Sequence, residues 1–388
     1  MLPSSTAASW SAELGSAQVL FGEGRLDDLG ELARDHGATV ALVVTDPGLR
    51  QAGHPRRALA SLEKAGITGV LFDGAEENPT TVHVEAGVEV ARQAGIDFLI
   101  GLGGGSAMDC AKGINFLLTN GGRMEDYWGV GKASKPMLPS IGIPTTAGTG
   151  SEAQSFALIS QPESHRKMAC GDKKARFRAL ILDPELLVTA PRRVMALSGF
   201  DAISHAVESY VTAKRNPLSQ LYAREAWRLL SSSFEGLLLS PQDPKPRRRM
   251  LLGATLAGAS IELSMLGAAH SCANPLTARF GVAHGGAVGL MLPAVVRFNG
   301  SAVNGLYGEL LATQGWASNG QGHGAALGAR LEELRSVAGL PQRLSEVGVR
   351  SEALPALAAE AAEQWTAQFN PRAVAAEDLE GLYREVLK

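Results

Sequence analysis

Four side chains in the second half of the chain have the types and spacing of a metal site. Asp201 and His205 are four residues apart in a stretch of helical character, so they share one helix face, roughly 5–6 Å apart at Cβ. His270 and His284 follow in Gly- and Ala-rich surroundings. One carboxylate and three imidazoles suit Fe²⁺ or Zn²⁺ and suit Ca²⁺ or Mg²⁺ poorly. Each histidine alone is also consistent with a hydrogen-bonded core residue, so the residues by themselves leave both interpretations open.

A glycine-rich turn in the first half could hold a phosphate group. The run GLGGGS, residues 101–106, ends an apolar stretch and precedes a helical one, residues 107–118. A helix N-terminus offers unpaired backbone N–H groups and the positive end of the helix dipole, and glycine lets a pyrophosphate approach the backbone closely. Ser106 adds a hydroxyl donor. Because the run is not the G-x-G-x-x-G fingerprint, a tight turn without a ligand is the alternative.

Two other strand ends carry residues that would suit a dinucleotide. Asp46 follows the run ALVVT, residues 41–45, where an acidic residue can accept hydrogen bonds from ribose hydroxyls and repel a 2′-phosphate. For Asp46 alone, a turn or helix cap is the simpler explanation, because Asp-Pro-Gly is good turn chemistry. The run TTAGTGSE, residues 145–152, also follows an apolar stretch, and its small hydroxyl residues and glycines would form a polar cradle.

The elements that must position these residues differ between the two halves. In the first half, β-branched runs alternate with helical stretches, which predicts a parallel sheet with crossover helices. The predicted strands are residues 41–45, 69–72, 98–102, 140–144 and 179–182, and predicted helices include 26–36, 57–65 and 80–94. From about Pro191 only helices are predicted. A chain of 388 residues is long enough for two domains, so we expect an α/β N-terminal Rossmann-like domain, residues 1–190, and an all-α C-terminal domain, residues 191–388.

The C-terminal helices should be separated at points rich in Asn, Pro and Gly. The expected breaks are residues 216–217, 241–246, 274–275, 319–324 and 370–371. The longest apolar stretch, residues 250–269, contains Glu262 and many small residues. We therefore expect it to be a closely packed buried helix rather than a membrane span.

Composition disfavours several classes of function. Aromatic residues make up only 5% of the chain and the net charge is −3, which argues against a stacking surface or basic groove for nucleic acid. Cys110, Cys170 and Cys272 lack the spacing of a zinc ribbon and indicate a reducing compartment. Residues 1–15 show no apolar export segment. We expect a cytoplasmic protein with a small-molecule partner and with neither nucleic acid nor membrane as a partner.

Ten short motifs occur within the first 300 residues. They are VTDPGL at 44–49, ENP at 77–79, GLGGGSAMDCAK at 101–112, DYWG at 126–129, IPTTAGTGSEA at 143–153, LDPEL at 182–186, GFDAISHAVESYVT at 199–212, NPLS at 216–219, GAAHSCANPL at 267–276 and AHGGAV at 283–288. In this order and spacing, the chain resembles the iron-containing, or group III, alcohol dehydrogenases. Because several independent motifs agree, the resemblance is specific, although the last stretch matches only as generic helices.

The resemblance implies a dehydroquinate synthase-like architecture in which NAD(P) and a metal meet between two domains. The implied cofactor contacts are Gly103, Gly104, Gly105 and Ser106 on the pyrophosphate, Asp109 on the nicotinamide side, Thr145, Thr146 and Thr149 on the adenine and ribose side, Lys167 near the ribose, and Asp46 as a selector for NAD. The implied metal ligands are Asp201, His205, His270 and His284. The metal, Fe²⁺ or alternatively Zn²⁺, would polarise the oxygen of a primary alcohol or aldehyde while hydride passes to or from nicotinamide C4. A homodimer through strands near residues 19–24 is also implied.

One position departs from the family pattern. Four residues after His270, where family members carry an active-site histidine, this chain has Asn274. Asparagine cannot titrate near neutral pH, so the proton must pass through water, a ribose hydroxyl or another side chain, or the substrate is unusual. The basic run KKARFR, residues 173–178, would favour an anionic substrate if it lay near the site, but we expect a solvated loop.

Three alternatives stay open at this point. The first is a reductase for a functionalised or anionic aldehyde within the same family, which Asn274 suggests. The second is a dehydroquinate synthase-like lyase, which would show no net turnover of NAD. The third is an NAD-binding protein without turnover, which the complete set of four ligands disfavours.

Overall fold

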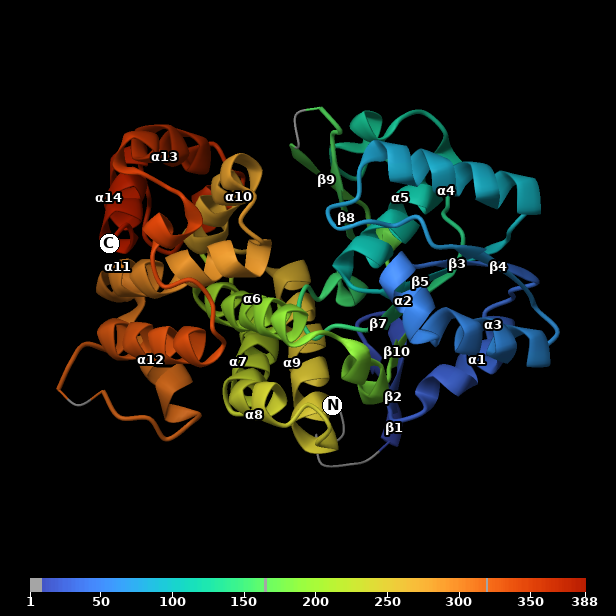
Figure 1. Cartoon of the computed structure of the whole chain (residues 1–388), viewed down its shortest axis with the longest axis horizontal. Coiled ribbons are helices and arrows are strands. Elements are labelled where there is room, and N and C mark those ends of the chain that lie inside the picture. Colours follow the sequence, from blue (N-terminus) through green and yellow to red (C-terminus); the bar gives the residue numbers. More distant parts are fainter. Residues whose placement is uncertain (1–8, 164–165, 319) are drawn as a thin grey trace. The chain divides into compact units, whose positions relative to one another are not determined.

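The computed structural model describes residues 9–163, 166–318 and 320–388. They form two compact units: the first contains the described residues up to Thr146 together with Gly150–Ala190, and the second contains Ala147–Thr149 and Pro191–Lys388. Figure 1 shows the strands confined to the first unit and the second built from helices alone. The expected α/β N-terminal part and all-helical C-terminal part are therefore confirmed.

A seven-stranded sheet with the order β1-β2-β10-β7-β5-β3-β4 is the framework of the first unit. Its strands are β1 (Ser9–Leu14), β2 (Ala17–Gly22), β3 (Val40–Val44), β4 (Thr68–Phe72), β5 (Phe98–Gly103), β7 (Ser140–Pro144) and β10 (Ala179–Leu182). β1 and β2 pair antiparallel, and the other neighbours are parallel. All five strands predicted from apolar runs are present, whereas the β1–β2 hairpin at the sheet edge was not predicted from such runs.

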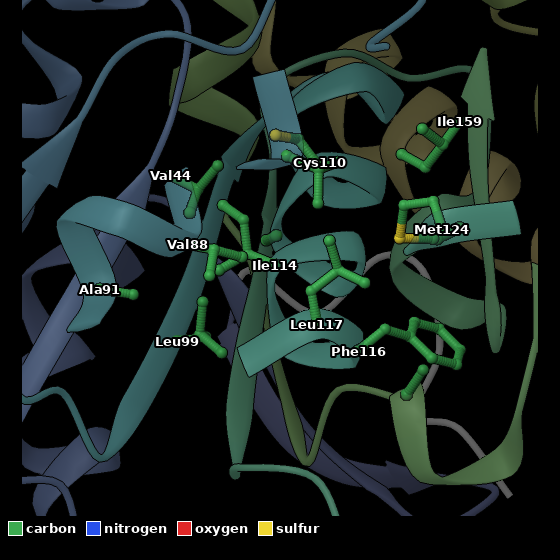
Figure 2. Close-up of a cluster of buried hydrophobic side chains, with 14 of the residues drawn as sticks. Val44, Val88, Ala91, Leu99, Cys110, Ile114, Phe116, Leu117, Met124 and Ile159 are labelled. Atoms are coloured by element: carbon green, nitrogen blue, oxygen red, sulfur yellow. The ribbon is translucent and has the colours of Figure 1, made fainter. Parts of the chain in front are cut away.

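Helices cover both faces of this sheet, which explains why its strands are almost continuously apolar. Along β5, Leu99 packs into one core while Phe98 and Ile100 pack into the other. The first core includes α4 (Thr81–Ala94) and α5 (Gly105–Asn120), and the second includes α1 (Leu29–Asp35) and α3 (His54–Lys64). In Figure 2, Ile114 and Leu117 of α5 lie among the labelled side chains of α4 and β5. This packing fixes the axis of α5 against the sheet.

A three-stranded sheet, order β6-β9-β8, adds to the first unit. Its strands are β6 (Gly129–Val130), β8 (Phe156–Ser160) and β9 (Lys167–Gly171). These strands were not predicted, because β6 has only two residues and because β8 and β9 show neither continuous burial nor clear alternation. The remaining short elements are η1 (Arg25–Asp28), α2 (Pro47–Ala52), η2 (Met124–Tyr127), η3 (Ser151–Ala153), η4 (Lys173–Ala175) and η5 (Pro184–Thr189).

The second unit is a helical assembly around α6. Its helices are α6 (Arg192–Val211), α7 (Pro217–Ser231), α8 (Phe234–Leu239), α9 (Pro244–Leu263), α10 (Ala268–Phe280), α11 (His284–Ala312), α12 (His323–Val337), η6 (Leu344–Val347), η7 (Ser351–Ala353), α13 (Leu354–Ala362), η8 (Ala367–Phe369) and α14 (Ala376–Val386). α6 packs against α7, α9 and α11, and every residue from Gly199 to Val211 is buried. A polar residue on α6 is therefore held in a dry, rigid setting.

Two expectations about these helices were wrong. Asn274 and Pro275 do not separate two helices, because both residues lie inside α10. Pro275 has no N–H to donate within the helix, and both Pro275 and Leu276 are buried against the rest of the unit, which favours continuation of the helix. Residues 250–269 do not form one helix, because α9 ends at Leu263 and α10 begins after a bend of 104°. Asn319, at the start of another expected break, lies outside the described residues.

Two helical segments among the described residues of the second unit approach the length and apolarity of a membrane span. Among the described helices, α11 meets that length and apolarity, and 72% of its apolar window is buried within the protein. The bent pair of α9 and α10 meets the criterion only if counted as one span. Buried core helices commonly have these properties, so the evidence for a membrane span is weak.

Candidate functional site

Three helices of the second unit bring the four proposed metal ligands together. Asp201 and His205 lie on the buried face of α6, His270 in the first turn of α10, and His284 at the start of α11. Around Oδ1 of Asp201, the Nε2 atoms of His205, His270 and His284 lie at 3.4, 3.6 and 3.8 Å. The ligand atoms of Asp201, His270 and His284 all lie within 4.8 Å of one another, and His205 approaches the same oxygen of Asp201. The positions of the four residues in the sequence span 84 residues, from 201 to 284.

The spacing of these atoms fits a divalent transition metal. Metal–ligand bonds of about 2.0–2.2 Å in tetrahedral geometry place neighbouring ligand atoms roughly 3.4 Å apart. Asp201, His205 and His270 are at most 5% exposed. Within the described residues, Asp201 Oδ1 and His270 Nε2 have no hydrogen-bond partner. Buried polar atoms without partners are costly, and a shared cation would satisfy both at once.

The electrostatics of the cluster favour a bound cation. Burial alone would raise the pKa of the Asp201 carboxyl, but His205, His270 and His284 beside it hold that pKa well below its usual range. Burial lowers the pKa of His205. Burial also acts to lower the pKa of His270, but the carboxylates of Asp201 and Glu208 outweigh it and raise the pKa to about 9. A metal ion binding at His270 must therefore displace a proton, so its affinity will fall at low pH.

The glycine run of the first unit forms a strand-to-helix turn between β5 and α5. Gly104 caps α5 without a side-chain hydrogen bond, and the first helical turn contains no acidic residue. The N–H groups at this N-terminus therefore keep their capacity to bind an anion. A Cβ on Gly103 would lie 2.7 Å from Cβ of Ala107, and one on Gly104 would lie 3.5 Å from Oγ1 of Thr146. The turn is thus a backbone cradle whose surface a side chain would fill.

Polar residues at neighbouring strand ends lie beside this cradle. β7, β5 and β3 are adjacent and parallel, so Thr145, Gly103 and Asp46 emerge at the same sheet edge. The N–H of Thr145 donates to the carbonyl of Gly103 at 3.0 Å. An Oδ of Asp46 lies 3.6 Å from the position a Cβ on Gly103 would take. Asp46 also accepts a hydrogen bond from Leu49 N at 3.0 Å, so it caps α2 as well.

A second polar group lies deeper along α5. Asp109 is 6% exposed and its Oδ1 lies 3.9 Å from Nζ of Lys112. Burial raises the pKa of Asp109 to about 6, although Lys112 and Lys167 act to lower it. Lys112 Nζ donates to the carbonyls of Ser151 and Phe156 at 2.6 and 2.9 Å. This buried group ties α5 to the loop before β8 and to the start of β9.

Two of the predicted residues are placed differently from the rest. Thr149 groups with the second unit, whereas Thr145 and Thr146 belong to the first. Asn274 lies one turn after His270 on α10 and is partly buried, and its Nδ2 donates to Oε1 of Gln364 at 3.0 Å. In the basic run at 173–178, Lys174 is paired with Asp172 at 2.9 Å.

Glu208 is the residue that sequence reasoning missed. Its Oε2 lies 2.5 Å from Nδ1 of His270, and its side chain is 5% exposed. The signal was present, because Asp201, His205 and Glu208 have the i, i+4, i+7 spacing of one helix face. It was overlooked because a glutamate in a helix is usually solvated.

Comparisons with known proteins agree along the whole chain. A family model described as iron-containing alcohol dehydrogenase matches residues 16–184, and the C-terminal model of the Fe-containing alcohol dehydrogenase family matches residues 195–387. Alcohol dehydrogenase 4 of Schizosaccharomyces pombe is 38% identical over 280 residues, which are 72% of this chain and 66% of that protein. NAD-dependent methanol dehydrogenase of Bacillus methanolicus is 32% identical over 95% of this chain and 97% of its own.

The fold of a solved relative agrees equally well. The crystal structure of 1,3-propanediol oxidoreductase superposes with a TM-score of 0.92 at 29% identity, covering 98% of this chain and 99% of its own. Both halves of the chain therefore match one family in sequence and in fold. The chain belongs to the iron-containing alcohol dehydrogenase family.

Proposed function

We propose that the protein is a metal-dependent, NAD(H)-linked oxidoreductase that interconverts a primary alcohol and an aldehyde. The observation that carries the proposal is the convergence of one buried carboxylate oxygen with three imidazole nitrogens at 3.4–3.8 Å. Membership of the iron-containing alcohol dehydrogenase family supports the reaction class. Asp201, His205, His270 and His284 are the proposed ligands, and Fe²⁺ is the proposed metal, with Zn²⁺ as an alternative that this ligand set also accepts.

Each unit supplies one part of the chemistry. When bound, a divalent metal supplies a Lewis acid for the substrate oxygen, and NAD(H) supplies or accepts the hydride. The chain holds the pyrophosphate through the backbone of Gly103 to Ser106 and the positive end of α5. The rigid packing of α6 keeps Asp201 and His205 in place, and their burial excludes water. Thr145, Thr146, Thr149, Asp109 and Lys167 are proposed to complete the cofactor contacts.

NAD is proposed as the cofactor in preference to NADP. Asp46 lies beside Gly103, and its carboxylate can accept hydrogen bonds from ribose hydroxyls while repelling a 2′-phosphate. The NAD dependence named for the Bacillus methanolicus relative supports the same choice. The capping bond to Leu49 does not conflict with this role, because it uses only one of the two carboxylate oxygens.

Asn274, which stands where the family pattern has a histidine, bears on the choice of substrate. Asn274 and Gln364 form a neutral amide pair one helical turn from His270. Neither side chain titrates near neutral pH, so the proton for the reaction comes from water, a ribose hydroxyl or another group. An amide pair recognises polar substituents, and this favours a functionalised aldehyde as the second candidate substrate class.

A homodimer and a cytoplasmic location complete the proposal. The strand near residues 19–24 that was expected to form the dimer is β2, and it has no free edge because it pairs with both β1 and β10. Among the described residues, β1 pairs only with β2, so its outer edge is the one open to a second copy of the chain. Cys110, Cys170 and Cys272 are buried and unbridged, in keeping with a reducing compartment. A gel-filtration mass of one subunit would exclude the dimer.

The experiment that tests the function follows NADH consumption. Anaerobically purified protein is reconstituted with Fe²⁺ and mixed with NADH and a panel of short, branched, aromatic, hydroxylated and anionic aldehydes. Loss of the near-ultraviolet absorbance of NADH is expected with at least one aldehyde. The same panel with NADPH should give slower turnover, because of Asp46.

The panel also separates the two substrate classes. Fastest turnover of a hydroxylated or anionic aldehyde would favour the functionalised class, whereas fastest turnover of a plain aliphatic aldehyde would favour a simple alcohol dehydrogenase. Absence of NADH consumption across the panel, with metal shown to be bound, would contradict the proposed reaction.

A further inference from the structure

Glu208 uses both of its carboxylate oxygens at the metal cluster. Oε1 accepts the backbone N–H of Ala269 at 2.8 Å, and Oε2 lies 2.5 Å from Nδ1 of His270. The carboxylate comes from α6 and both partners come from the first turn of α10. Glu208 therefore links the helix that carries Asp201 and His205 to the helix that carries the third ligand.

The contact with Glu208 determines which nitrogen of His270 is available. A carboxylate only accepts hydrogen bonds, so Nδ1 of His270 must carry a proton and donate it. Nε2 is left to face Oδ1 of Asp201 at 3.6 Å, and neither atom has a hydrogen-bond partner among the described residues. A cation between Nε2 and this carboxylate oxygen would bind both atoms at once. The ring is thus oriented with Nε2 toward the place of a cation.

We infer that Glu208 is a positioning residue that orients His270 and selects the tautomer in which Nε2 binds the metal. The inference rests on the proposed metal-dependent function. Carboxylates that accept the second N–H of a ligating histidine raise the basicity of the ring and fix its orientation. Removing such a partner typically weakens metal binding by about 10- to 100-fold.

A purely structural role is the alternative explanation, because Glu208 also caps α10. The two first N–H groups of α10 are satisfied from distant elements: Ala268 N donates to Oδ1 of Asn370 at 3.2 Å, and Ala269 N donates to Glu208. A carboxylate at a helix N-terminus is further stabilised by the helix dipole. A cap-only role predicts a loss of stability without a specific effect on the metal.

The substitution Glu208→Gln separates the two roles because glutamine keeps the shape and one acceptor oxygen. If that oxygen continues to cap Ala269, the amide NH₂ faces Nδ1 of His270 and forces the proton onto Nε2, the ligating atom. If the amide rotates, two donors face each other at Ala269. The first orientation loses the free Nε2, and the second keeps it only with two donors opposed at the N-terminus of α10. Both orientations therefore disfavour metal binding, while the volume of the side chain is nearly unchanged.

Asn370→Ala is the matched control for lost capping. It removes the acceptor of Ala268, both hydrogen bonds between Asn370 and Asn299, and the bond that Asn370 donates to the carbonyl of Arg372, and none of these involves His270. Its loss of stability should therefore be at least that of a helix cap alone. Loss of a helix cap costs about 1 kcal/mol, which lowers Tm by roughly 2–4 °C for a unit of this size. The metal affinity of this variant is expected to stay within about twofold of the unchanged protein.

The test measures Co²⁺ and Zn²⁺ affinity by chelator competition, the visible spectrum of the Co²⁺-loaded protein, and Tm of the metal-free protein. For Glu208→Gln, we expect affinity about 10- to 100-fold weaker, an altered Co²⁺ spectrum and a Tm close to that of the unchanged protein. The inference about Glu208 would be overturned, with the proposed function left standing, if Glu208→Gln kept the metal affinity and the Co²⁺ spectrum of the wild-type protein. The same conclusion would follow if its losses of affinity and Tm only equalled those of Asn370→Ala. If the wild-type protein bound neither Co²⁺ nor Zn²⁺, both the inference about Glu208 and the proposed function would be overturned.

Discussion

The cofactor cradle of the first unit and the metal cluster of the second are built from different kinds of atoms. The cradle consists of backbone N–H groups at the start of α5, and its glycines matter because they lack side chains. The cluster consists of four side-chain atoms from three helices, and its ligands matter because of the atoms they carry. The cradle is therefore sensitive to added atoms, whereas the cluster is sensitive to removed ones.

The two regions also differ in how they are held. The turn before α5 is local, spanning a few residues, and the packing of Ile114 and Leu117 fixes the helix behind it. The cluster joins residues 201 to 284 and depends on the packing of α6, α10 and α11. The cradle, as a local turn, is therefore tested by a substitution that adds atoms. The cluster, as a tertiary assembly of side chains, is tested by substitutions that remove them.

The largest effect is expected from removing a ligand of the cluster. Asp201→Ala takes away the oxygen around which the three Nε2 atoms lie, and should abolish metal uptake and lower turnover by at least about 10³-fold. NADH binding should stay close to normal, because the cradle is made of backbone groups elsewhere in the chain. Metal content and NADH fluorescence titration check both halves of this prediction; normal turnover in a variant without metal would contradict it.

Adding a single methyl group to the cradle should weaken NADH binding and leave metal binding unchanged, which is the reverse of the result expected for Asp201→Ala. In Gly103→Ala, the new Cβ would lie 2.7 Å from that of Ala107, so the turn must shift. We expect NADH to bind about tenfold more weakly, equivalent to about 1.4 kcal/mol, with unchanged metal content. Gly381→Ala on α14, where a Cβ meets open space, is the control and should change neither quantity. Loss of metal from Gly103→Ala would contradict the prediction that the cradle and the metal cluster respond independently to substitution.

Asn274→His tests whether position 274 acts on the chemistry beside the cluster. A histidine there can donate a proton below its pKa of about 6.5, so aldehyde reduction should become faster as the pH falls through that value. The unchanged protein should lack this slope. The hydrogen bond to Gln364 is lost in the same variant, at a cost of about 1 kcal/mol of stability. Gln364→Leu is the control, since it removes that bond without adding a titratable group; equal pH slopes in all three proteins would exclude a proton-transfer role.

The smallest effect is expected at Asp46, where a side chain contributes to the cradle. Asp46→Gly should raise the ratio of NADPH to NADH turnover by a few-fold to about tenfold, because the repulsion of a 2′-phosphate is lost. Asp46→Asn keeps an acceptor for Leu49 N and removes only the charge. A shift in both variants would assign the preference to charge, whereas an unchanged ratio would leave Asp46 as a helix cap only.

Much of the fold could be predicted because its signals are local. The apolar runs that became β3, β5 and β7 are buried on both faces, so each is almost continuously hydrophobic. The break at Asn216-Pro217 also carries its own signal, since Asn216 caps α7 and Pro217 follows at the first helical position. β8 and β9 have the same length as β3 and β7, but they mix buried residues with half-buried or exposed ones and so lack the continuous burial of the central strands.

The residues that supply the proposed metal ligands could also be predicted from the sequence. Asp201 and His205 share a helix face by spacing alone, and the Gly- and Ala-rich surroundings of His270 and His284 marked them as further candidates. The resemblance to iron-containing alcohol dehydrogenases then implied that all four are ligands. The contact between Glu208 and Nδ1 of His270 could not be predicted in this way, because it joins α6 to α10 across 62 positions. The bond between Asn274 and Gln364 spans 90 positions and involves a C-terminal stretch that matched only as generic helices.

By itself, the sequence determined the strand and helix periodicities, the glycine turn and the kinds of atom available to bind a metal. These follow from the chemistry of residues close together in the chain. Only the tertiary structure decided that α10 continues through Pro275, that Asp46 lies beside Gly103, and that three imidazoles surround one carboxylate oxygen. The physical reason is that burial and hydrogen bonding between distant segments set these distances, and no local pattern encodes the free energy of that packing.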